Sequence, residues 1–204
     1  MKKDNLKFRP DIVFHVYTHS NGDENIFRED ENYRFFLRRY AKYIVPVART
    51  YAFCLMPNHF HLMIAVRSKD NLINYFTEQG KSIRYDKPDQ DLSRLITRQF
   101  GNLLNSYTKS FNKMYDRKGK LFYRTLKAIA VESKNYYKQL IIYIHQNPIT
   151  HGFVNEVAEW PYSSYHLVIS GKKTRINRKE VLSLFNGKDT FIQLHKNPIK
   201  IDKD

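Results

Sequence analysis

Two histidines interrupt an apolar run in the segment YAFCLMPNHFHLMIAV, residues 51–66. His59 and His61 are two positions apart, so in a β-strand their side chains would point to the same side. Two neutral imidazoles that converge in this way suit a divalent cation. Zinc would want further Cys, His or carboxylate ligands nearby, so a hard cation that also takes oxygen ligands from a substrate fits better. The spacing leaves a second interpretation open, in which both histidines are surface residues on an open sheet face.

A second stretch whose residues could take part in a reaction is LIIYIHQNPITHGFV, residues 140–154. On a helix, Tyr143 would lie at the flank of the apolar stripe, and Asn147 would follow four residues later on the same side. A phenol and an amide oxygen would then point toward one spot. The relation is approximate because Pro148 disfavours helical geometry at the residue before it. Taken alone, one of 15 tyrosines on an amphipathic helix is more often a packing residue.

The hydrophobic pattern predicts the elements that must position these residues. Alternation predicts a first strand over 11–19, and helical spacing of aromatic and aliphatic residues predicts a helix over 30–43. Strands over 49–56 and 59–66 would pair as a β-hairpin across the turn signal Pro57-Asn58.

The second half of the chain continues the alternation of helices and strands. We expect, in order, a polar segment over 69–92 with KPDQD as a loop, a long helix over about 93–115, a fourth strand within 121–131, a helix from Ser133 to Pro148, and short helices to the end. The order β-α-β-β-α-β-α predicts an α+β ferredoxin-like sandwich, an antiparallel sheet with helices on one face, followed by an added helix that carries the tyrosine. We place the catalytic domain at 1–165 and a small basic extension at 166–204.

The charge balance indicates a polyanionic partner. Lys and Arg total 35 against 20 Asp and Glu, which gives a net charge of +15. Nucleic acid is the first candidate. A membrane role is not expected, because no segment approaches the roughly 20 apolar residues of a transmembrane helix and the N-terminus has no apolar signal core. Cys54 is the single cysteine, so we expect a small buried hydrophobe, no internal disulfide and a cytoplasmic location.

Two motifs resemble those of a known family. Met56-Pro57-Asn58-His59-Phe60-His61-Leu62 resembles the HUH motif of single-strand DNA nucleases, in which two histidines flank a hydrophobic residue. The run Tyr143-Ile144-His145-Gln146-Asn147-Pro148, then Gly152, then Trp160-Pro161-Tyr162-Ser163-Ser164-Tyr165, resembles the signature of REP-associated tyrosine transposases. These are relatives of the small insertion-sequence transposases that use one tyrosine. The resemblance covers about residues 10 to 166.

The resemblance implies a mechanism. His59 and His61 would hold Mg²⁺ or Mn²⁺, and Asn147 would be the third protein ligand. Tyr143 would attack a phosphodiester in single-stranded DNA and leave a 5′-phosphotyrosine link and a free 3′-hydroxyl. The family acts at folded DNA hairpins, so single-stranded or hairpin DNA is the expected partner. Whether the protein works as a monomer or a homodimer is left open.

Several basic residues are candidates for contacts with DNA phosphates, which supply affinity but little sequence choice. The predicted set is Arg34, Arg38, Lys109, Lys113, Arg117, Lys120, Arg124 and Lys127. Each group could instead be an ordinary solvated face, and for any single lysine the solvated position is the favoured interpretation. His15 and His19 are not assigned to the metal, since packing or surface positions explain them as well, and His145 is expected to be structural.

Three other functions compete with a strand-transferase. A domesticated, catalytically silent binder of DNA or RNA hairpins is the main alternative, and the presence of all four candidate residues argues against it. A phosphoesterase with two H-x-[ST] motifs ranks low, because no H-x-S or H-x-T occurs in the sequence. A zinc-dependent binding module ranks lower still for want of ligands.

Overall fold

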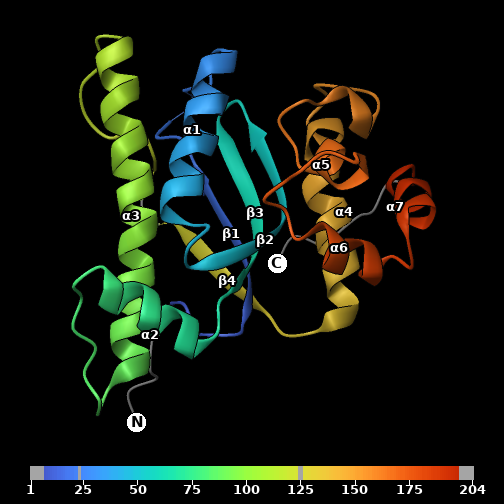
Figure 1. Cartoon of the computed structure of the whole chain (residues 1–204). Helices are drawn as coiled ribbons and strands as arrows, with labels where there is room; N and C mark the ends of the chain where they lie inside the picture. The colour runs from blue at the N-terminus through green and yellow to red at the C-terminus, as the bar shows by residue number, and fades with distance from the viewer. Residues whose placement is uncertain (1–6, 23, 124–125, 198–204) are drawn as a thin grey trace.

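The structure is a computed structural model that describes residues 7–22, 24–123 and 126–197 (Figure 1). Its elements follow the order β1 (Val13–His19), α1 (Asp30–Tyr43), β2 (Ala48–Met56), β3 (His59–Val66), α2 (Lys69–Glu78), α3 (Pro88–Met114), β4 (Lys127–Val131), α4 (Lys134–Thr150), the 3₁₀ helix η1 (Val157–Glu159), α5 (Tyr165–Ile169), α6 (Arg178–Leu184) and α7 (Lys188–His195).

The predicted ferredoxin-like sheet is confirmed. The described strands form one antiparallel sheet of order β2-β3-β1-β4, in which β1 and β3 are central neighbours. In the register of this central pair, Tyr17 lies opposite His61 and His19 lies opposite His59. Residues directly opposite each other in an antiparallel pair share a face. The alternate residues of β1 therefore stand beside the histidines of β3.

The helices of the first six elements lie on one face of this sheet, as expected, and the added helix α4 covers the other face (Figure 1). α1 and α3 pack on the face formed by Phe60, Leu62 and Ile64, whereas α4 packs on the opposite face against β2 and β3. His59 and His61 are only 3% and 6% exposed as a result. The interpretation of both histidines as surface residues on an open face is therefore wrong.

Two predictions about local structure are also wrong. The segment 69–92 contains helix α2, in which Leu72 and Phe76 are buried, and the long helix α3 begins at Pro88 instead of near residue 93. Proline is tolerated at the first helical position because the N–H that it lacks would have no partner there. The carboxylate of Asp91 accepts hydrogen bonds from the backbone and guanidinium of Arg84, which fixes the chain before α3.

Helix α4 does not end at Pro148, where its end was expected. It continues to Thr150, and Asn147 is helical within it. Tertiary packing overrides the local preference here, because Asn147 and Pro148 are both buried. The Asn147 side chain also donates a 2.9 Å hydrogen bond to the carbonyl oxygen of Tyr143, one turn earlier. The four-residue relation between Tyr143 and Asn147 is therefore that of a regular helix.

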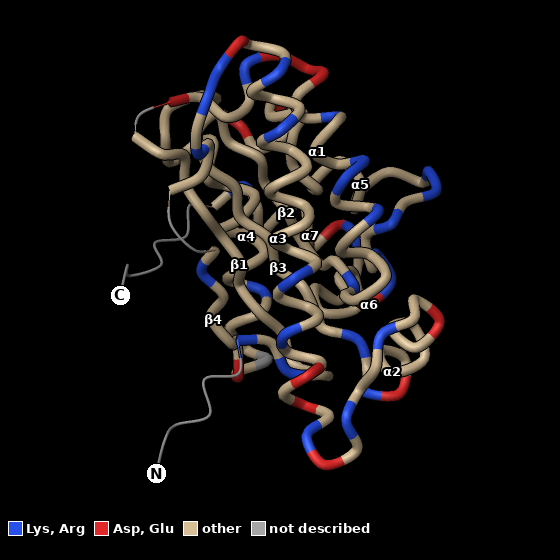
Figure 2. Tube along the Cα trace, turned by 90° about the vertical axis from the view of Figure 1, so that its left-hand side faces the viewer, with Lys and Arg blue, Asp and Glu red and all other residues tan. Residues whose placement is uncertain are grey.

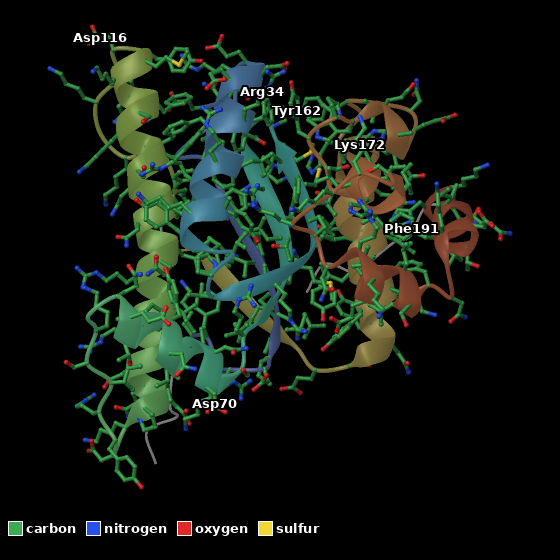
Figure 3. The ribbon with its side chains drawn as sticks, in the orientation of Figure 1. Arg34, Asp70, Asp116, Tyr162, Lys172 and Phe191 are labelled. Carbon is green, nitrogen blue, oxygen red and sulfur yellow. The ribbon has the colours of Figure 1, made fainter. Side chains whose placement is uncertain are left out.

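The segment after residue 165 packs on α4 and belongs to the same buried cluster. Phe185 and Phe191 are fully buried, and Phe191, labelled in Figure 3, lies beside the ring of His145. The side chain of Gln146 donates to the backbone oxygens of His195 and Asn197. The domain boundary at residue 165 stays a prediction, but the residues after it supply partners for polar groups of α4.

A directional chain of hydrogen bonds links β2, α4 and α7. Nδ1 of His195 lies 2.7 Å from the carbonyl oxygen of Phe191, which can only accept, so Nδ1 carries the proton. Nε2 of His195 therefore accepts from Nδ1 of His145 at 2.9 Å. Nε2 of His145 in turn accepts from the hydroxyl of Ser164 at 2.7 Å, and that hydroxyl accepts the backbone N–H of Phe53 at 2.9 Å. The predicted structural role of His145 is confirmed.

The motif Trp160–Tyr165 closes the outer edge of β2. The backbone of Tyr162 and Ser164 pairs with Leu55 and Phe53, and the indole N–H of Trp160 donates to the carbonyl oxygen of Leu55. The ring of Tyr162 also stacks on Tyr33 of α1 at 3.5 Å between centroids, near the labelled Arg34 in Figure 3. An edge strand that is covered in this way is protected from pairing with another chain. This part of the signature therefore has a structural role in the fold.

Candidate active site

The four residues predicted to act together lie together on the α4 face of the sheet. The rings of His59 and His61 are 5.2 Å apart between centroids, and the ring of Tyr143 is 5.7 Å from that of His61. The side chain of Asn147 lies close enough to His59 to influence its pKa. Successive side chains of a strand point to opposite faces, so the two histidines of β3 lie on the same face. The phenol and the amide lie on the same side of α4 because they are about one helical turn apart. Their chemical roles stay predictions.

His59 is held in a defined tautomer by its neighbour in sequence. Its Nδ1 lies 2.7 Å from the side-chain oxygen of Asn58, so Nδ1–H donates and Nε2 keeps a free lone pair. Burial lowers the pKa of His59 to about 4, with smaller contributions from His19 and His151, whereas the nearby side chain of Asn147 acts in the opposite direction. His59 is therefore a neutral imidazole at physiological pH, which is the form that binds cations.

His61 is more deeply buried and lies beside a third histidine. Burial holds the pKa of His61 well below its usual range, and the neighbouring histidines, led by His15, lower it further. Nδ1 of His61 is 3.0 Å from Nε2 of His15, and the two rings stack. Burial also lowers the pKa of His15 to about 4. Both rings are neutral, so they share one hydrogen between the two facing nitrogens.

Asn147 is oriented by its own helix. Its amide nitrogen donates to the carbonyl oxygen of Tyr143, so the amide oxygen is the side-chain atom left to bind a cation. Burial raises the pKa of the Tyr143 phenol and nearby Tyr17 adds to this, whereas a hydrogen bond with Asn147 lowers it. An amide oxygen beside two neutral imidazoles is a donor set that suits a divalent cation with further oxygen ligands from a substrate.

The structure adds histidines that the sequence interpretation did not assign to the site. His15 contacts His61, His19 stacks on His59 at 4.9 Å, and His151 lies 5.1 Å from His59 between ring centroids. A signal was present in the alternation of His15, Tyr17 and His19, which places all three on one face of β1. In a ferredoxin-like sheet β1 and β3 are neighbours, but the register that brings these residues beside His59 and His61 is not readable from the sequence.

A closed zinc site is not formed by the part of the chain that the structure describes. In these residues, no group of three or more His, Cys, Asp and Glu side chains is arranged to hold a metal ion. His59, His61 and Asn147 fall outside that definition because one of the three donors is an amide. Two imidazoles and one amide oxygen leave coordination positions for substrate oxygens, so these residues fit Mg²⁺ or Mn²⁺.

Lys and Arg residues are spread over much of the molecule (Figure 2), and the predicted DNA-binding residues lie on several different elements. Lys127 lies at the edge of the site, where its ammonium is 5.4 Å from the ring of Tyr17. Lys109 and Lys113 are exposed on α3, which covers the opposite face of the sheet. Lys120 is exposed, and its carbonyl oxygen accepts a hydrogen bond from Arg117.

The arginines of the predicted set also have protein partners. Arg34 and Arg38 form ion pairs with Asp30 and Glu31 on the surface of α1. The guanidinium of Arg117 contacts the carboxylate of Glu24 and carbonyl oxygens of its own turn, so it has a structural role. Arg124 lies outside the described residues. These contacts leave the role of each residue toward DNA as a prediction.

Cys54 is fully buried, and burial raises the pKa of its thiol well above the usual value. The prediction of a small buried hydrophobe is confirmed. Among the described residues, every helix falls short of the length or hydrophobicity needed to cross a bilayer.

Comparison with known proteins agrees with the motifs. A Haemophilus influenzae protein, provisionally named REP-associated tyrosine transposase, is 29% identical over 117 residues, which are 57% of this chain and 58% of the relative. The chain is similar to REP-associated tyrosine transposases. A solved structure of a REP-associated tyrosine transposase bound to a REP hairpin matches with a TM-score of 0.55 and 15% identity over 82% of this chain and 86% of the other. This second likeness shows the fold. No family model matches the chain.

Proposed function

We propose that the protein is a metal-dependent strand-transferase that cuts and rejoins single-stranded DNA at hairpin-associated sites. The observation that carries the proposal is the placement of Tyr143 beside His59, His61 and Asn147 on one buried face of the sheet. A nucleophile beside a cation-binding donor set is the arrangement that transfer of a phosphodiester requires.

The chemical step forms one bond and breaks one bond. The Tyr143 oxygen attacks the phosphorus and loses its proton, while the bond from phosphorus to the 3′ oxygen breaks. The departing 3′ oxygen takes up a proton and becomes a hydroxyl, so no oxidant, reductant or water is consumed. The 5′ phosphate is then held as a phosphotyrosine ester. Because the ester keeps the energy of the broken bond, a 3′-hydroxyl can reverse the step and join strands.

The residues around Tyr143 have distinct parts in this scheme. His59, His61 and Asn147 would hold Mg²⁺ or Mn²⁺, which supplies charge neutralisation at the phosphate and favours the phenolate. Burial raises the pKa of the Tyr143 phenol in the protein alone, so the phenol is protonated at neutral pH. Asn147 contacts both the tyrosine turn and His59, which ties the position of the nucleophile to that of the cation ligands.

Hairpin DNA is the proposed partner. The net charge of +15 supports binding to a polyanion, and the structurally similar protein was solved with a REP hairpin bound. Lys127 at the edge of the site is the first candidate for a phosphate contact.

The test is a covalent-adduct assay. Labelled hairpin DNA with single-stranded flanks is incubated with the protein and Mn²⁺ and separated on a denaturing gel. We expect a slow-moving adduct that is lost in Tyr143→Phe and kept in Tyr137→Phe, a matched control on the same helix. An adduct that persists in Tyr143→Phe would move the nucleophile elsewhere. Hairpin binding without any adduct, across several hairpins and both metals, would favour the catalytically silent hairpin binder.

A further inference from the structure

His15 contacts His61 diagonally across the central strand pair. In the register of β1 and β3, His15 lies opposite Met63 and Tyr17 lies opposite His61. The imidazole of His15 therefore reaches along the sheet by two residues, which is within the range of diagonal contacts on one face. The facing nitrogens, Nε2 of His15 and Nδ1 of His61, are 3.0 Å apart, and the ring planes are 23° from parallel.

A single hydrogen must lie between these two nitrogens, and its position decides what His61 can do. If His15 donates, Nδ1 of His61 is the acceptor and its Nε2 carries the proton, so the ring has no lone pair left for a cation. If His61 donates from Nδ1, its Nε2 has a lone pair. Only the second arrangement matches His59, where Nδ1–H donates to Asn58. The two histidines of the motif can therefore bind one cation only when His15 acts as the acceptor.

We propose that His15 is a positioning residue that accepts Nδ1–H of His61 and so fixes the tautomer in which Nε2 of His61 binds the cation. This inference rests on the proposed function and deepens its metal site. Partners of this kind orient metal-bound histidines in many proteins, and their loss typically costs 10–100-fold in metal affinity.

The surroundings of His61 give His15 no obvious substitute. His61 is only 6% exposed, so bulk water has little access to its Nδ1. The ring of Tyr17 lies 5.5 Å from that of His61 and contacts it by stacking. Removal of the His15 imidazole therefore leaves the tautomer of His61 without this acceptor, whereas changes at Tyr17 that keep the ring leave it in place.

The experiment measures the tautomer and the metal affinity without DNA. In the metal-free protein labelled with ¹⁵N, two-bond ¹H–¹⁵N spectra should show His61 protonated at Nδ1 and unprotonated at Nε2. Titration with Mn²⁺ should show a loss of about 10–100-fold in affinity for His15→Phe. His15→Gln, whose amide oxygen can accept the same hydrogen bond, should recover most of the affinity, and Tyr17→Phe should bind as the unaltered protein does.

The outcomes separate this inference from the proposed function. A metal-free His61 protonated at Nε2, or unaltered affinity in a folded His15→Phe, would overturn the role of His15 and leave the strand-transferase proposal standing. If His15→Phe does not fold, the tautomer of the unaltered protein and the affinity of His15→Gln decide the matter. Failure of the unaltered protein to bind Mn²⁺ would instead overturn the metal site on which both proposals rest.

Discussion

The hydroxyl of Ser164 joins strand β2 to helix α4, so its removal should destabilise the protein strongly. It accepts the backbone N–H of Phe53 from β2 and donates to Nε2 of His145 on α4. Ser164 and His145 are fully buried. Ser164→Ala would leave one donor and one acceptor without a partner. A buried polar group left unsatisfied costs about 1–3 kcal/mol, so the two together predict a loss of about 2–6 kcal/mol.

Thermal and urea unfolding can measure this loss. For a domain of this size, each kcal/mol shifts Tm by about 2–4 °C, so Ser164→Ala should lower Tm by at least about 4 °C. Ser163→Ala is the matched control, because the Ser163 hydroxyl is also buried but accepts only a 3.3 Å hydrogen bond from the Tyr165 N–H. The control should lose about 1 kcal/mol. Equal losses in the two variants would refute the argument that the Ser164 hydroxyl links β2 to α4.

Three further predictions concern pH and charge. Burial lowers the pKa of His195 from 6.5 to about 4. As the pH drops from about 6.5 toward 4, the unfolded chain binds a proton at His195 before the folded protein does, so the free energy of unfolding should fall. In His195→Gln, the free energy of unfolding should decrease less over the same pH range. The pKa of Asp91 is lowered from 3.8 to about 2, mainly by its hydrogen bond with Arg84. Asp91 therefore stabilises the folded protein fully above about pH 4, and this stabilisation is lost as the pH falls toward 2. Asp91→Asn should lower Tm at pH 7 and make Tm depend less on pH between 4 and 2. Lys127→Gln should reduce the slope of log affinity for hairpin DNA against log salt by about 0.7–0.9. Lys113 was also predicted to bind DNA, but it lies on α3, across the sheet from Tyr143, so Lys113→Gln should leave the slope unchanged. Identical slopes for both variants would contradict the proposed contact at Lys127.

The sequence predicted the core of the fold because its patterns there are strong. The helix expected over 30–43 and the strand expected over 59–66 have the bounds of α1 and β3. Each combines a clear hydrophobic period with a turn signal at its boundary. Helix α2 was missed because only Leu72 and Phe76 of its ten residues are buried, which is too short a pattern to separate from a polar loop.

Two other misses have a tertiary cause. Pro148 predicted the end of a helix from local preference, but the packing of α4 on the sheet keeps the helix intact around it. The same limit applies to His15 and His19. Their alternation was visible, but only the register of β1 against β3 brings them beside His59 and His61. Register depends on the whole sheet, so the candidate site was predicted from its motif residues and without their neighbours.

The hydrogen-bond chain through His145 depends on residues that the ribosome makes after helix α4. His195 follows His145 by 50 residues, so the ribosome must produce all of α5, α6 and α7 before the buried imidazole of α4 has its final partner. Until then, His145 and Gln146 have polar groups that the finished protein satisfies with residues from the C-terminal helices. A nascent chain in which Tyr143 has just left the ribosome therefore carries the proposed nucleophile on a helix that still lacks these C-terminal partners. If Tyr143 acts as proposed, its helix would become fully anchored only after the C-terminal helices have been made.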